Sequence, residues 1–143
     1  MPGDPVIDDR DLARLLGAYR RVAVVGLSVR PERASHGVAR YLIREGYTVI
    51  PVNPNYPEVL GLRSYPSLLD VPGPVEIVDV FRRPDAVPEV VDQAIARGAK
   101  VLWLQEGVIH EPAARRAAAH GMTVVMDRCI LREHLRLIRA LRS

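Results

Sequence analysis

The chain has one cysteine, Cys129, in its 143 residues. No disulfide can form within it, and a reducing, cytoplasmic setting is the simplest expectation. No apolar run approaches the roughly 20 residues that a membrane-spanning helix needs, so we expect no membrane partner. The first residues, Met1 to Asp4, lack the basic and apolar regions of a signal peptide.

Aromatic residues are also scarce. They make up 5% of the chain and leave few rings on which single-stranded bases could stack. The net charge is +3, but basic and acidic residues are interspersed along the sequence. These features argue against a nucleic-acid partner. They allow either an ordinary charged surface or a local basic pocket for a small anionic ligand.

Several motifs of nucleotide-binding and catalytic proteins are missing. The chain has neither the G-x-G-x-x-G fingerprint of NAD-binding proteins nor a P-loop, and no acidic residue follows the strand that ends at Val52. It also lacks a Cys/His cluster for a metal and a nucleophile elbow with a Ser-His-Asp set. NAD, a P-loop nucleotidase reaction and a structural zinc site are therefore disfavoured.

What the sequence does contain is a recurring unit. Hydrophobic residues reach 48%, enough for the core of one domain spanning residues 1–143. Three times a helical pattern ends at a glycine and a Val- or Leu-rich run follows, as expected where glycine closes a helix before a buried strand. The glycines are Gly46, Gly98 and Gly121, and the runs cover residues 47–52, 100–104 and 123–126.

Further elements complete the pattern. Strands are predicted over residues 21–25 and 75–80, with a short edge strand near 62–65 and terminal helices over about 9–19 and 129–142. Helices that alternate with buried strands imply parallel pairing through right-handed crossovers. The fold class is therefore α/β: a Rossmann-like, doubly wound, mainly parallel sheet with helices on both faces.

In such sheets ligands bind beyond the carboxyl ends of the strands. The loop from Gly26 to Ser35 carries Arg30 and Arg33 and leads into a helix that Ser35 is predicted to cap. Free N–H groups at a helix start favour phosphate, and arginines add charge-assisted hydrogen bonds. A simple turn with surface arginines is the alternative, and the loop alone does not decide between the two.

Two later loops have similar content. Arg82 and Arg83 follow a strand end, where they suit phosphate or pyrophosphate, and Phe81 is placed either over an adenine ring or in the core. Gln105 and Gly107 follow the strand that contains Trp103, whose own role is expected to be core packing. Each of these loops follows the carboxyl end of a parallel strand, and those ends lie at the same edge of the sheet. The sequence therefore predicts one anion site at that edge.

Candidates for catalysis are few. His36 stands at a helix start, where it either touches phosphate or is a polar residue of the first turn. Asp79 and Asp127 lie near strand ends and are expected to accept hydrogen bonds from backbone or arginine groups, or to cap a helix, rather than act as an acid–base pair. Cys129 is expected to be an inert buried thiol, although a mixed disulfide with a thiol ligand is chemically possible.

The motifs together resemble those of a known family. Gly26-Leu27-Ser28, Val52-Asn53-Pro54, Phe81-Arg82-Arg83-Pro84, Gln105-x-Gly107 and Asp127-Arg128-Cys129 are similar, in this order, to motifs of the stand-alone CoA-binding domain proteins. That family resembles the N-terminal CoA-binding domain of succinyl-CoA synthetase α-subunits and of NDP-forming acyl-CoA synthetases. The similarity runs from about Leu12 to Leu137.

The resemblance implies a strand order of 3-2-1-4-5-6 and coenzyme A as the ligand. It places Gly26, Leu27 and Ser28 along the phosphates, with Arg33 and Ser35 holding them. It places the adenosine beside Val52, Asn53 and Pro54, the middle of the ligand beside Phe81, Arg82 and Arg83, and the pantetheine arm beside Gln105 and Gly107.

The synthetases carry their catalytic histidine in a second domain, which this sequence lacks. We therefore expect a protein that binds CoA or acyl-CoA and is not an enzyme by itself. The alternative is the CoA-binding half of a split synthetase or transferase that a separate chain completes. A homo-oligomer and such a partner chain are both compatible with the sequence.

Overall fold

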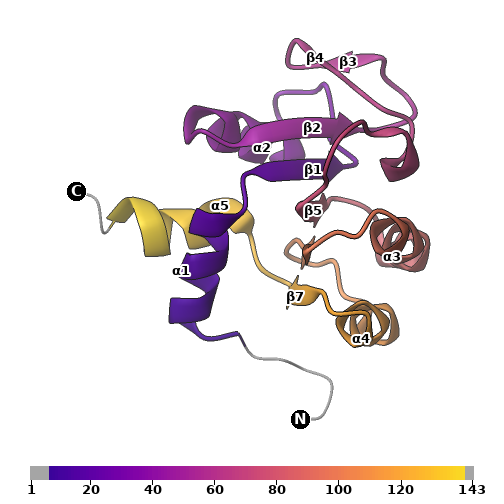
Figure 1. The fold of residues 1–143 in the computed structure, drawn as a ribbon. Helices are drawn as coiled ribbons and strands as arrows, with labels where there is room; N and C mark the ends of the chain where they lie inside the picture. The colour runs from indigo at the N-terminus through magenta and orange to yellow at the C-terminus, as the bar shows by residue number, and fades with distance from the viewer. Residues whose placement is uncertain (1–6, 141–143) are drawn as a thin grey trace.

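The computed structural model describes residues 7–140 and centres on a parallel sheet (Figure 1). Five strands lie in the order β2-β1-β5-β6-β7, and every neighbouring pair is parallel. Their bounds are β1 Arg21–Val25, β2 Thr48–Val52, β5 Ile77–Val80, β6 Val101–Leu104 and β7 Thr123–Met126. The order reverses between β1 and β5, so the predicted Rossmann-like α/β class is confirmed.

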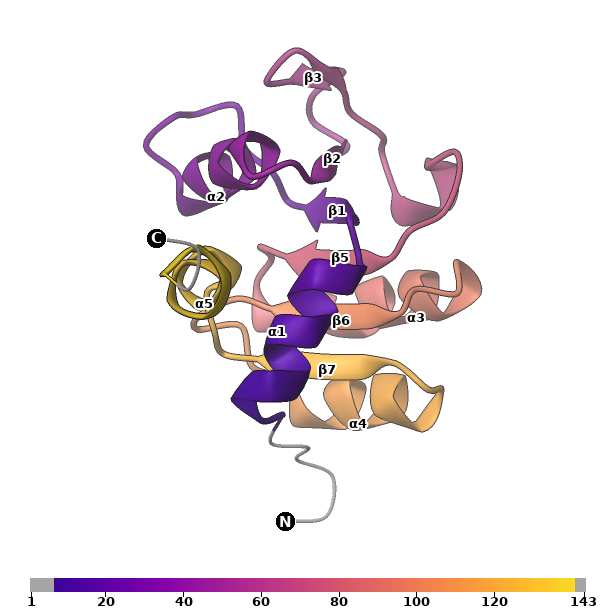
Figure 2. The ribbon, with the colours of Figure 1, turned by 60° about the vertical axis from the view of Figure 1, so that its left-hand side comes forward.

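Helices cover both faces of this sheet. Helices α3 and α4 pack on one face, and α1, α2 and α5 pack on the other (Figure 2). Their bounds are α1 Asp9–Ala18, α2 Ala34–Arg44, α3 Val87–Ala96, α4 Glu111–Ala119 and α5 Ile130–His134. A π-helical segment, η3 Leu135–Arg139, continues α5, and 3-10 turns η1 Leu68–Asp70 and η2 Pro84–Ala86 precede β5 and α3.

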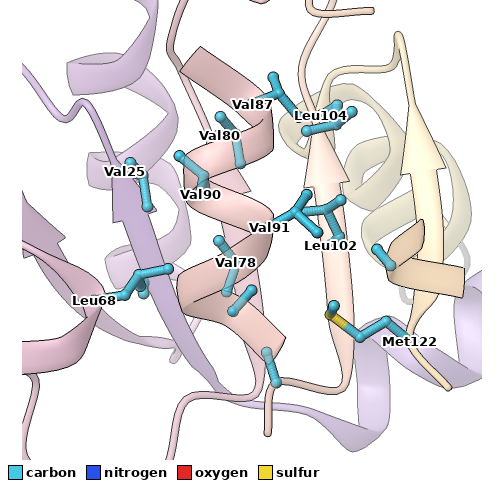
Figure 3. Packing of buried hydrophobic residues seen from close by; sticks show 14 of the residues in the cluster. Val25, Leu68, Val78, Val80, Val87, Val90, Val91, Leu102, Leu104 and Met122 are labelled. Carbon is cyan, nitrogen blue, oxygen red and sulfur yellow. The ribbon is translucent and has the colours of Figure 1, made fainter. Parts of the chain in front are cut away.

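The sheet separates two apolar cores. Val78 and Val80 point toward α3, where Val87, Val90 and Val91 meet them (Figure 3). On the other face, Val24 and Trp103 lie with the buried leucines of α1 and α2. Strands with apolar residues on both faces explain why their sequences show no alternation of polar and apolar residues.

The three predicted units of helix, glycine and strand are confirmed. Gly46, for example, has φ +93° and lies two residues after the end of α2 and two residues before the start of β2. Trp103 is fully buried, as expected, and its indole N–H donates to the carbonyl of Arg128 at 2.9 Å. No helix within residues 7–140 is long and apolar enough to cross a membrane.

The predicted edge strand near residues 62–65 is wrong in detail. Leu62–Arg63 is β4, which pairs antiparallel with β3, Glu58–Val59, in a separate hairpin. Only Tyr65 reaches the main sheet, through a single parallel bridge to Val52. Five of the six strands in the implied 3-2-1-4-5-6 order are present, in the order 2-1-4-5-6. The remaining strand is reduced to that bridge, because the tight turn through Gly61 folds the segment back on itself.

Helix starts and ends also differ from the expectation. Helix α2 begins at Ala34 with Arg33 at its N-cap, so Ser35 lies in the first turn and does not cap the helix. The predicted C-terminal helix is confirmed from Ile130 and changes to π-helix at Leu135. Its expected last residues, 141–142, lie outside the described part of the chain, as do residues 1–4.

Candidate functional site

A pocket of about 650 Å³ opens at the carboxyl end of the sheet. The segments that follow β1, β2, β5, β6 and β7 all contribute to its wall, together with the start of α2. This is where ligands bind in open parallel sheets. The lining residues are Gly26, Ser28, Arg30, Arg33, Ala34, Ser35, Val38, Tyr56, Phe81, Arg82, Arg83, Gln105, Glu106, Val108 and Cys129.

The structure brings together most of the residues that the sequence singled out. Those that line the pocket are Gly26, Ser28, Arg33, Ser35, Phe81, Arg82, Arg83 and Gln105. The others, Leu27, Val52, Asn53, Pro54 and Gly107, are not in its wall. Leu27 and Val52 are buried in the two cores, on opposite faces of the sheet. Pro54 is exposed.

Asn53 and Gly107 support the surrounding loops. The side-chain amide of Asn53 donates to the carbonyl of Leu27 at 3.1 Å, while its oxygen accepts from the N–H of Asn55 at 2.9 Å. The N–H of Gly107 donates to the Asp127 carboxylate at 2.8 Å. Asp127 therefore accepts a backbone hydrogen bond, one of the two roles expected for it.

The loop before α2 is held by two serines. The Ser35 hydroxyl accepts from the N–H of Ser28 at 3.0 Å, and the Ser28 hydroxyl accepts from the N–H of Arg30 at 3.1 Å. These bonds bend the chain between β1 and α2 so that both serines line the pocket. The positive end of the α2 dipole lies at the same place, which favours a bound anion.

The pocket wall is strongly basic. Within residues 7–140, no salt bridge is formed by Arg30, Arg33 or Arg82. The Arg83 guanidinium lies 3.7 Å from the Asp85 carboxylate, and both side chains of this pair are largely exposed. Glu106, the acidic residue in the lining, is paired with Arg132 at 3.1 Å. The unpaired guanidinium groups therefore set the charge of the site, and they suit phosphate groups.

A buried acid lies beneath one wall of the pocket. Asp79 in β5 is fully buried, and its Oδ1 accepts from the Gln105 side-chain amide at 2.5 Å. Burial raises the pKa of Asp79 to about 7, although the Gln105 hydrogen bond opposes this shift. The other oxygen, Oδ2, is also buried and has no hydrogen-bond partner. Asp79 accepts from a side chain, not from the backbone or arginine groups that we expected.

Two further candidates, His36 and Cys129, differ in their relation to the pocket. His36 is buried and its Nδ1 has no hydrogen-bond partner, but the residue is not part of the pocket wall. Cys129 is half-buried and does line the pocket, so the expectation of a fully buried thiol is wrong. Residues 7–140 contain no cluster of three His, Cys, Asp or Glu side chains that could hold a metal ion.

Sequence reasoning missed part of the wall. Tyr56 and Val38 line the pocket, as do Ala34, Glu106 and Val108. Tyr56 lies four residues beyond the end of β2, close to the Val52-Asn53-Pro54 motif, which is the sequence signal that points to it. Val38 in α2 belongs to the buried core and also lines the pocket.

Comparison with known proteins gives the site a context. Residues 20–135 match the model of the family described as CoA binding domain. The uncharacterized protein YneT of Bacillus subtilis (strain 168) is 41% identical over 124 residues, which cover 87% of this chain and 92% of YneT. A solved structure, a hypothetical protein from Pyrococcus horikoshii OT3, has a TM-score of 0.91 and 43% identity and covers 96% of this chain and 99% of that one.

Larger enzymes match as well. An acetate–CoA ligase (ADP-forming) II from Archaeoglobus fulgidus is 32% identical over 83 residues, which are 57% of this chain and 12% of the enzyme. The relationship is to the N-terminal part of such synthetases, so the resemblance drawn from the sequence motifs is confirmed. The match accounts for a small share of the ligase.

Proposed function

The chain belongs to the CoA binding domain family, and on this premise we propose that it binds coenzyme A or an acyl-CoA in the pocket at the carboxyl end of its sheet. The observation that carries the proposal is a set of arginines that line the pocket beside the start of α2 and have no acidic partner within residues 7–140: Arg30, Arg33 and Arg82. Coenzyme A carries a diphosphate and a ribose phosphate, and these groups need such a basic wall.

The size and chemistry of the pocket also support this ligand. A volume of about 650 Å³ is within the range of cofactor pockets. Phe81 and Tyr56 provide aromatic surface for a base, and Gln105 provides a polar group for the uncharged arm. At the start of α2, the N–H groups of Ala34 and Ser35 donate to no other group within residues 7–140 and can reach phosphate oxygens, whereas the N–H of His36 donates to the carbonyl of Arg33 at 3.1 Å. In this arrangement the residues bind and orient the ligand, and none of them is assigned a chemical step.

Isothermal titration with CoA, dephospho-CoA, ATP and NAD tests the proposal. We expect CoA to bind most tightly and dephospho-CoA to bind more weakly, because the latter lacks one phosphate. Arg33→Ala and Arg82→Ala should each weaken CoA binding. Selective binding of NAD, or equal affinity for all four ligands, would overturn the assignment.

The relationship to acetate–CoA ligases favours a second candidate, in which this domain supplies the CoA site of a split synthetase or transferase completed by a separate chain. Affinity purification of the chain from its own cells tests this. Recovery of a partner that restores acyl-CoA synthesis from acid, CoA and nucleotide supports the split enzyme, whereas a CoA-loaded chain without such a partner supports the binding protein.

A further inference from the structure

The buried contact between Asp79 and Gln105 fixes one end of a pocket side chain. Gln105 is 4% exposed and lines the pocket, and its Nε2 donates to the Asp79 carboxylate at 2.5 Å. An ionised carboxylate only accepts hydrogen bonds, so it selects the NH₂ end of the carboxamide. Asp79 is fully buried in a strand that lies between β1 and β6, where its register partners are Val24 and Trp103.

The other end of the carboxamide is then an oxygen. Within residues 7–140, Gln105 Oε1 has no hydrogen-bond donor, and it is not among the buried atoms that lack a partner. The remaining exposure of this residue is toward the pocket that it lines. The site therefore presents an acceptor at this point, between the arginines after β5 and the loop that Asp127 holds.

We infer that Asp79 is a positioning residue that turns the carbonyl oxygen of Gln105 into the pocket, where it accepts a hydrogen bond from an amide N–H of the bound ligand. This inference rests on the proposed function, since the pantetheine arm of coenzyme A contains two secondary amides, each with one N–H. The ionised phosphates offer no donor to this acceptor. The adenine amino group and the ribose hydroxyl are donors, so adenosine 3′,5′-bisphosphate tests whether the acceptor serves the arm, as we infer, or the nucleotide.

The test compares ligands that differ by a single N–H. Two CoA analogues are prepared, each with one pantetheine amide replaced by an ester, and adenosine 3′,5′-bisphosphate serves as the nucleotide without the arm. Titrations at about pH 8 keep most of the Asp79 carboxyl ionised, since its pKa is about 7. We expect one ester analogue to bind the unchanged protein about 10-fold more weakly than CoA, because the Gln105 oxygen, once covered by the bound ligand, has lost its donor.

Two variants separate positioning from folding. Asp79→Leu removes the acceptor at similar volume in apolar surroundings, and Gln105→Met removes the carboxamide at similar length. In both, the difference between CoA and the sensitive ester analogue should fall to about 3-fold or less, while affinity for adenosine 3′,5′-bisphosphate stays unchanged. Asp92→Leu, an exposed site on α3, is the matched control and should keep the full 10-fold difference.

The outcomes distinguish this inference from the proposed function. If CoA does not bind the unchanged protein, the proposed function is overturned and this inference with it. If CoA binds but neither ester analogue is weakened, or the weakening persists in Asp79→Leu, the positioning role alone is overturned. An equal loss of CoA and adenosine 3′,5′-bisphosphate in Asp79→Leu also contradicts it, because that pattern indicates damage to the whole pocket.

Discussion

A side chain on Gly26 would overlap the backbone carbonyl of Phe81. Gly26 has φ +88°, its N–H donates to the carbonyl of Val52 at 2.8 Å, and the Arg82 side chain also borders the vacant Cβ position at 3.2 Å. The ends of β1, β2 and β5 therefore converge on one residue that has no room for a methyl group. This close approach brings the first loop and the Phe81–Arg83 loop into the same pocket wall.

Gly26→Ala should accordingly destabilise the protein by more than about 3 kcal/mol, since backbone strain adds to the overlap. The matched control is Gly46→Ala, which has a similar φ of +93° but open space around the Cβ position. It should cost only about 1 kcal/mol. Urea unfolding measures both, and equal losses would mean that contact with Phe81 contributes nothing.

The arginines that line the pocket are expected to determine the affinity for CoA. Arg33→Ala and Arg82→Ala should each weaken CoA binding by about 10-fold, and the salt dependence of binding should become shallower, because charge-assisted contacts to phosphate are lost. Arg83→Ala should have a smaller effect, since its guanidinium is shared with Asp85. Titrations at two salt concentrations measure this.

Arg44→Ala is the control for those variants, because Arg44 lies in the last turn of α2, at the end away from the pocket. Its CoA affinity and salt dependence should equal those of the unchanged protein. A loss as large as that of Arg33→Ala would show that overall charge, not the pocket wall, determines binding.

Because Asp79 is buried, we expect the free energy of unfolding to depend on pH. Its carboxyl has a pKa of about 7 in the folded protein and titrates near 3.8 when unfolded, so the folded state keeps a proton that the unfolded state releases. The free energy of unfolding should therefore fall by up to about 4 kcal/mol as the pH rises from about 4 to about 7, and then level off. Unfolding measured across this range tests the expectation.

The matched variant for this measurement is Asp79→Asn, which removes the titration and keeps the shape. It should gain stability relative to the unchanged protein as the pH rises toward about 8, whereas Asp92→Asn at an exposed site should follow the unchanged protein. Parallel curves for all three proteins would assign the pH dependence to other groups.

A buried polar contact between α2 and α5 is expected to contribute to stability. The Tyr41 hydroxyl lies 2.7 Å from Nδ1 of His134, and both residues are almost fully buried. Tyr41→Phe should cost about 1–3 kcal/mol, because the His134 nitrogen loses a partner that water cannot replace. Thermal unfolding measures the loss.

Tyr19→Phe is the reference, since the Tyr19 hydroxyl forms no hydrogen bond within residues 7–140 and the ring is partly buried beside the same core. It should change stability by less than about 0.5 kcal/mol. Equal effects for the two tyrosines would contradict a specific role for the contact with His134.

Much of the fold was predictable, because the local sequence patterns of the strands and helix ends agree with their places in the sheet. Buried strands such as Val101–Leu104 have no polar face, and before β2, β6 and β7 a glycine after the preceding helix marks where the strand begins. The outer edge was not predictable from residues 62–65, because one bridge at Tyr65 depends on tertiary contacts and leaves no periodic pattern.

The candidate site was predictable to the level of loops. Parallel strands must end at one edge, so Arg33, Arg82 and Gln105 were expected together, and they line one pocket. The orientation of individual side chains was not predictable. The Asn53 side chain bonds to backbone groups of its own loop and of the first loop. Helix α2 begins two residues earlier than its sequence suggests, so Ser35 lies in the first turn and accepts from the N–H of Ser28 instead of capping the helix.

The single bridge between Val52 and Tyr65 has a consequence for association. Strand β2 lies at the edge of the sheet, and an edge with free N–H and C=O groups can recruit another chain and aggregate. The N–H of Tyr65 donates to the carbonyl of Pro51, and the carbonyl of Tyr65 accepts from the N–H of Asn53. Tyr65 therefore pairs with the backbone groups at the carboxyl end of the β2 edge. Pro51 itself offers no N–H. Pro51 and Tyr65 thus leave few free backbone groups at this part of the β2 edge, which disfavours pairing with a strand of another molecule.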